Sequence, residues 1–195
     1  TTADNNTAVG HTALKANTTG TANTAVGRTS LVSNTTGSNN SALGLGALEN
    51  NTTGDGNVSV GKNSLTANTT ADNNTSVGFH SMLANTTGTS NTAVGQLALT
   101  SNVTGDGNVA VGRCALPQNT ADFNTAVGCG AFKVNTSGTN GVAIGYQALA
   151  SNTTGTNIVA VGASALSSNT TAINNVAVGF SALSTNVTGS DNTAL

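Results

Sequence analysis

The residues of this chain that could take part in chemistry are few and scattered. The two histidines, His11 and His80, lie far apart and predict surface residues rather than a metal site. Glycoside cleavage requires two neighbouring carboxyl groups in a cleft, and the acids give no convincing pair. They occur singly, at or near predicted turns: Asp4, Asp55, Asp72, Asp106, Asp122 and Asp191. We therefore expect no catalytic residue, no metal, no cofactor and no enzymatic activity.

A repeat of 17 residues positions every one of these side chains. The second residue of a Val-Gly pair, or of its Leu-Gly or Ile-Gly variant, recurs at Gly10, Gly27, Gly44, Gly61, Gly78, Gly95, Gly112, Gly128, Gly145, Gly162 and Gly179. All steps are 17 residues except the step of 16 from Gly112 to Gly128. A short fixed period is typical of a solenoid. We expect one repeat array over residues 1–195, interpreted as an excerpt of a longer chain without caps or as a subunit that stacks end to end.

Each repeat predicts one lap of a coil. Numbered from its first residue, the consensus is N-T-A-V-G-x-x-A-L-x-x-N-T-T-G-x-x. Positions 1 to 4 predict a strand with positions 2 and 4 facing inward. Gly at position 5 predicts a bend, A-L-x-x a second short strand, and N-T-T-G a closing turn. Two helices do not fit into 17 residues of this composition. The predicted fold class is all-β, a parallel β-roll or β-solenoid of about eleven coils.

Stacking of identical positions predicts columns along the coil. The Asn of position 12 becomes a ladder, and the apolar residues of positions 4 and 9 become the core. The predicted core comprises Val9, Leu14, Val26, Leu31, Val60, Leu65, Val94, Leu99, Val111, Leu116, Ile144, Leu149, Val161, Leu166, Val178 and Leu183. Position 3 accepts only Ala or Ser although it should face outward. That restriction predicts a second chain packed against positions 3 and 8, in an intertwined or packed homotrimer.

The remaining residues suggest contacts more than chemistry. Cys114 and Cys129 fall in neighbouring coils and adjoining columns, about 6 Å apart between Cα atoms, so they form a candidate disulfide or two free thiols. Adjacent Thr at positions 13 and 14 raise ice binding as an alternative. N-x-T and N-x-S sequences at the closing turn are interpreted as turns rather than glycosylation sites. Position 6 varies most and gives a candidate exposed contact column: His11, Arg28, Lys62, Phe79, Arg113, Tyr146 and Phe180.

Composition narrows the partners. A net charge of −2 with only 6% charged residues predicts no nucleic-acid binding. The chain has no 18-residue apolar run, so no membrane insertion is expected.

The motifs resemble those of known fibres. "NTAVG", "NVAVG" and "GVAIG" followed by "xxAL" resemble the head repeats of trimeric autotransporter adhesins, and the 17-residue form with "NTTG" is similar to repeats of phage and algal-virus tail-fibre proteins. The resemblance implies a trimeric β-roll in an adhesive fibre that is extracellular, on a cell surface or on a virion. The partners would be the chain itself and a receptor or glycan. A self-assembling extracellular filament is a further alternative.

Overall fold

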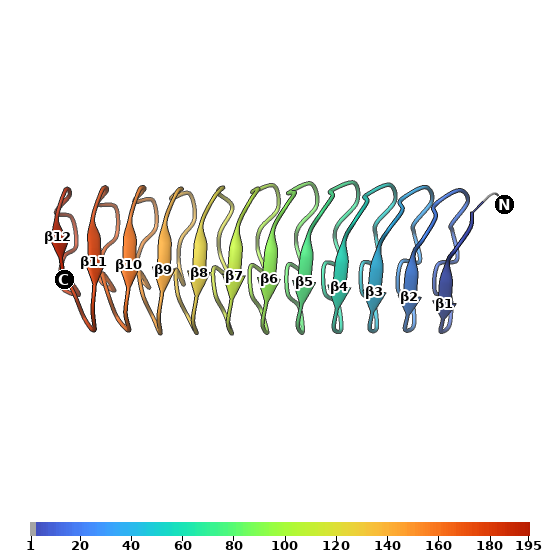
Figure 1. The fold of residues 1–195 in the computed structure, drawn as a ribbon, viewed down its shortest axis with the longest axis horizontal. Helices are drawn as coiled ribbons and strands as arrows, with labels where there is room; N and C mark the ends of the chain where they lie inside the picture. Colours follow the sequence, from blue (N-terminus) through green and yellow to red (C-terminus); the bar gives the residue numbers. More distant parts are fainter. Residues whose placement is uncertain (1–2) are drawn as a thin grey trace.

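Twelve short strands stack side by side into one parallel sheet along a rod, with the chain ends at opposite ends of the rod (Figure 1). The computed structural model describes residues 3–195. The strands are β1 (Thr7–Val9), β2 (Thr24–Val26), β3 (Ser41–Leu43), β4 (Val58–Val60), β5 (Thr75–Val77), β6 (Thr92–Val94), β7 (Val109–Val111), β8 (Thr125–Val127), β9 (Val142–Ile144), β10 (Val159–Val161), β11 (Val176–Val178) and β12 (Thr193–Ala194). Each strand pairs in register with the equivalent strand of the next coil, as Thr7 does with Thr24. The predicted parallel β-solenoid of about eleven coils is confirmed.

The rest of each lap is turn, and the predicted second strand over positions 8 to 11 is absent from the described coils. The reason is backbone conformation, since positions 7 and 9 are left-handed, with φ of 58° at Thr12 and 52° at Leu14. An extended strand cannot contain such residues. Hydrogen bonds between coils nevertheless continue through this segment: the Leu14 N–H donates to Ser30 O at 3.0 Å and the Ala16 N–H to Val32 O at 3.1 Å.

The strands face the opposite way from the prediction. Position 3 is the buried one, as at Ala25, Ala93 and Ala160, each with no exposed surface. Positions 2 and 4 lie on the outer face of the sheet. The valines and isoleucine predicted as core are therefore outside the coil in the single chain, half-buried or exposed: Val9, Val26, Val60, Val94, Val111, Ile144, Val161 and Val178. The Leu column does lie in the interior, from Leu31 to Leu166, and is half-buried at Leu14 and Leu183 in the outermost coils.

Positions 3 and 8 are small because they face each other across a narrow interior. Where both are serine, their hydroxyls contact the opposite wall. The Ser59 Oγ donates to Ser64 O at 2.8 Å, and the Ser64 Oγ donates to Ser76 O at 2.9 Å in the next coil. A side chain larger than Ala or Ser would push these walls apart. The prediction that positions 3 and 8 form the contact between chains is therefore wrong.

Asparagine fills the other half of the interior. At position 12 the Asn34 Nδ2 donates to Asn17 Oδ1 and to Gly37 O, both at 2.9 Å. At position 1 the Asn23 Nδ2 donates to the same Gly37 carbonyl at 2.8 Å. These hydrogen bonds satisfy the buried amides of Asn23 and Asn34, which would destabilise the fold if they were left unpaired. The predicted Asn ladder is confirmed from Asn17 to Asn102 and again from Asn119 to Asn169.

The ladder is interrupted at the 16-residue lap. The turn after Asn119 lacks one residue, so the Asn119 Nδ2 donates to Ala121 O, two residues on, at 2.7 Å. In regular coils the corresponding bond spans three residues, as from Asn102 to Gly105. Asn102 Oδ1 is consequently buried without a hydrogen-bond donor. The shortened turn thus costs one rung of the ladder while strands β7 and β8 keep their register.

Glycine at position 5 is required by stacking. Gly10 has a φ of 134°, a conformation that other residues rarely adopt. A Cβ at Gly10 would also lie 2.5 Å from the carbonyl oxygen of Gly27 in the next coil. No other residue type fits this column.

Candidate functional site

The outer face of the sheet runs along the rod from β1 to β12. We call the outward residues of positions 2 and 4 the sheet face. In strands β1 to β11 it contains only Thr, Ser, Val, Leu and Ile, without a single charged side chain. Position 4 is exposed at several places, reaching 58% at Val9 in the first coil and still 39% at Ile144. Position 4 is an apolar column of Val, Leu43 and Ile144, and position 2 is a mixed column of Thr, Ser and Val. An uncharged surface with a continuous apolar column is suited to packing against protein.

The variable column at position 6 projects from the bend that follows each strand. All seven predicted contact residues are exposed, including Tyr146 at 57% and Phe180 at 84%. One of them, Phe79, contacts the position-7 residue of its own coil. The rings of Phe79 and His80 stack with centroids 3.8 Å apart, and Lys62 Nζ of the preceding coil lies 5.9 Å from the centroid of the Phe79 ring. The role of this column in binding remains a prediction.

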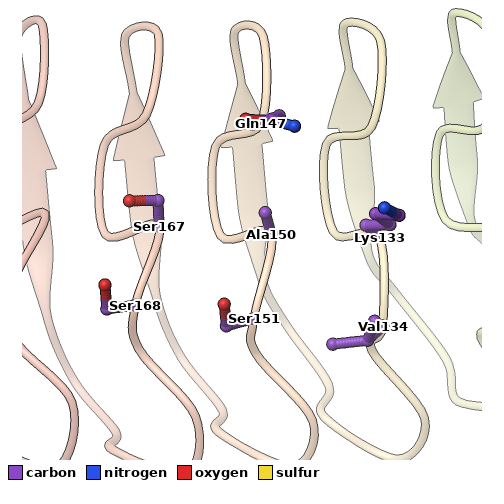
Figure 2. A pocket seen from close by; sticks show the side chains of 7 residues that line it. All are labelled: Lys133, Val134, Gln147, Ala150, Ser151, Ser167 and Ser168. Carbon is purple, nitrogen blue, oxygen red and sulfur yellow. The ribbon is translucent and has the colours of Figure 1, made fainter.

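A hollow of about 460 Å³ lies on the turn side of three consecutive coils (Figure 2). Lys133 and Val134 come from the coil of β8, Gln147, Ala150 and Ser151 from that of β9, and Ser167 and Ser168 from that of β10. Ser151 and Ser168 occupy the same position in neighbouring coils, and small residues at positions 10 and 11 leave the space open. Sequence reasoning missed this site. The available signal was Lys133 at position 10 followed by Ala150 and Ser167 in the same column.

A second hollow of about 200 Å³ adjoins the first and shares Lys133 and Gln147 with it. Its other lining residues are Arg113, Cys114, Cys129, Gly130 and Tyr146. Two residues of the predicted contact column, Arg113 and Tyr146, therefore come together here with the two cysteines of the predicted disulfide. We call the two hollows the Lys133 groove. Its lining includes two cations and no acid.

The two cysteines lie side by side at this groove as free thiols. The Gly130 N–H donates to Arg113 O at 3.1 Å, which brings the peptide before Cys114 against the peptide after Cys129. Gly130 leaves space beside Cys129, because a Cβ there would meet only Gln147 Cγ, at 3.6 Å. The proximity inferred from the repeat is consistent with this geometry, and the disulfide remains a prediction.

The aspartates of position 16 belong to turns. Asp55 Oδ1 accepts from the Ser38 N–H at 2.6 Å, and Asp72 Oδ1 accepts from the Asp55 N–H at 2.7 Å. Asp106 and Asp122 do the same farther along. Within residues 3–195 no group of three or more His, Cys, Asp or Glu side chains could hold a metal ion. In that range, no helix has the length and apolar character needed to span a bilayer.

The threonines of position 13 are also structural. The Thr18 hydroxyl donates to Thr35 O at 2.9 Å and the Thr35 hydroxyl to Thr52 O at 3.0 Å, and the pattern recurs along the rod. A hydroxyl that donates to the backbone is not free to order water by donation. This column therefore gives little support to the ice-binding alternative.

Comparisons of the chain with protein-family models, curated proteins and solved structures gave no match.

Proposed function

We propose that this chain is a structural segment of a homotrimeric adhesive fibre, extracellular, on a cell surface or on a virion. The observation that carries the proposal is the uncharged sheet face, with its apolar position-4 column, that runs the length of the rod. A continuous column of exposed apolar side chains on an uncharged face is typical of a protein interface. A second and third copy of the same chain are the natural partners, since their columns have the same spacing from coil to coil.

The two columns of the sheet face support three copies around an axis along the rod. Each chain can place its position-4 column against the position-2 column of the next chain. Such a head-to-tail contact closes into a ring when the rotation fits. At about 4.8 Å per coil, eleven steps from β1 to β12 give an interface about 50 Å long. This arrangement replaces the predicted contact through positions 3 and 8, because the residues at those positions lie inside the coil.

The mass of the assembly in solution tests the proposal. Light scattering coupled to size-exclusion chromatography should give three times the 18.9 kDa mass of the chain. Val94→Asp with Val111→Asp places two charges on the sheet face, where burial of an unpaired charge is costly, and should yield folded monomers. The matched control is Thr87→Asp with Thr104→Asp, at exposed turn positions of neighbouring coils, and should remain trimeric.

Other outcomes would contradict the proposal. A wild-type monomer would leave the sheet face without the proposed partner. Mass that grows with concentration would favour an end-to-end filament, and thermal hysteresis in a monomer would favour ice binding. Circular dichroism of each variant separates loss of assembly from loss of folding.

A further inference from the structure

We propose that the Lys133 groove binds an acidic saccharide. The inference deepens the proposed adhesive function and rests on it for its biological meaning, although the groove itself belongs to a single chain. Its ligand class follows from three properties of the lining: charge, one exposed aromatic ring and a set of hydroxyl and amide groups.

The charge is concentrated and unopposed by the lining. The chain has five Lys or Arg residues in total, and two of them, Arg113 and Lys133, line the groove. The acids of this region, Asp106 and Asp122, are engaged with backbone N–H groups at position 16, in the closing turn. An arginine guanidinium offers two parallel donors to a carboxylate or sulfate, and a lysine ammonium adds a point charge. The groove therefore selects an anion.

The aromatic and polar residues select a sugar over a simple ion. Tyr146 is 57% exposed and presents an apolar ring with a polar tip. Gln147, Ser151, Ser167 and Ser168 supply donors and acceptors that match ring hydroxyls. In Figure 2 these four side chains are spread over the coils of β9 and β10 rather than converging on one point. Spread-out polar groups suit an extended ligand with many hydroxyls.

The size of the groove agrees with this class. The larger hollow, about 460 Å³, lies within the usual range of about 300–1,000 Å³ for small-molecule sites. The smaller hollow extends the lining to Arg113 in the coil of β7 and to Tyr146 in the coil of β9. A saccharide of two or three units can place its acid group between Arg113 and Lys133 and its remaining rings beside the serines.

Calorimetric titration with tri-galacturonic acid tests the proposal. We expect saturable binding that weakens with added salt, and no binding of the methyl-esterified trisaccharide. Lys133→Gln and Arg113→Gln should each weaken binding about tenfold, because each removes one charge-assisted contact. Tyr146→Ala should weaken it without changing the salt dependence. Lys15→Gln and Arg28→Gln are matched controls at the same repeat positions near the other end of the rod, and should bind like the wild type.

A sulfated disaccharide in a parallel titration separates the two sources of acid groups. Tighter binding of the sulfated sugar assigns the groove to sulfated glycans. If Lys133→Gln and Arg113→Gln weaken the binding of both sugars equally, the groove is assigned to acidic sugars generally. No binding of any acidic sugar by a folded, trimeric protein overturns this inference and leaves the proposed fibre standing. Binding that survives in a wild-type monomer overturns the trimer instead. Equal weakening in the Lys15 and Arg28 controls would show non-specific charge attraction and also overturn the site.

Discussion

The residue type at an interior position depends on its own backbone conformation and on the side chain that it contacts in the next coil. Position 9 accepts Leu, Met82 or Phe132 but no β-branched residue, because its backbone is left-handed, with φ near 50°; branching at Cβ makes that conformation costly. The bulk of Phe132 is compensated at position 1 of the next coil. That position is Gly141 instead of the usual Asn, and a Cβ there would overlap Phe132 Cζ.

The Phe132 and Gly141 pair gives a prediction about stability. Gly141→Asn should lower the free energy of unfolding by about 1–3 kcal/mol, because it overpacks the interior against the Phe132 ring. Adding Phe132→Leu should recover most of that loss, since Leu and Asn are the usual residues at the two positions. Chemical denaturation of the two single variants and the double variant measures the coupling. Additive effects would show that the two side chains do not share the space.

The cysteine pair gives a second prediction at this scale. Treatment with a small-molecule disulfide should produce a Cys114–Cys129 bridge by two thiol exchanges, releasing two equivalents of the reagent thiol. The bridge closes one short lap and should raise the free energy of unfolding by up to about 3 kcal/mol. Peptide mass mapping identifies the bridge, and thermal unfolding with and without reductant measures its effect. Cys129→Ser removes both. Intermolecular bridges alone would count against the inferred side-by-side geometry.

At the scale of the element, the closing turn controls the interior ladder. Insertion of Thr between Thr120 and Ala121 recreates the turn "NTTAD" that occurs at residues 68–72. The longer turn should let the Asn119 amide donate to Asn102 Oδ1, now buried without a donor. We expect a gain of about 1 kcal/mol in the free energy of unfolding, the usual net value of one such bond. Insertion of Thr between Thr69 and Thr70, in a turn of regular length, is the control and should not stabilise the protein.

Periodicity predicted the coil, its parallel register and the Asn ladder, because stacking places like on like. It could not decide which side of the strand faces inward. Alternation fixes only that positions 1 and 3 oppose positions 2 and 4, and the larger apolar residues of positions 2 and 4 favoured the wrong side. The small size of position 3 was the better guide, since the opposite wall lies close. The prediction of a second strand was wrong because a leucine at position 9 does not indicate that its backbone is left-handed. The Lys133 groove could not be predicted, because the sequence does not show which columns lie next to each other across a turn.

At the scale of the whole molecule, every strand contacts only the strand before it and the strand after it. No contact among the described strands joins distant parts of the rod. Stability is then approximately a sum of coil terms and neighbour terms. A less stable coil, such as the one in which the Asn ladder is interrupted, therefore affects only the stability of its surroundings, and the adjoining strands keep their register.

The same stacking makes the length of the rod proportional to its number of repeats. A gene that gains or loses one repeat changes the length of the protein by about 4.8 Å, because each new coil docks on a surface identical to the one it covers. Reach can therefore change in small, equal increments while cross-section and register are preserved. Groups on the outside, such as those of the Lys133 groove, can be carried nearer to or farther from a target by copying coils that themselves bind nothing.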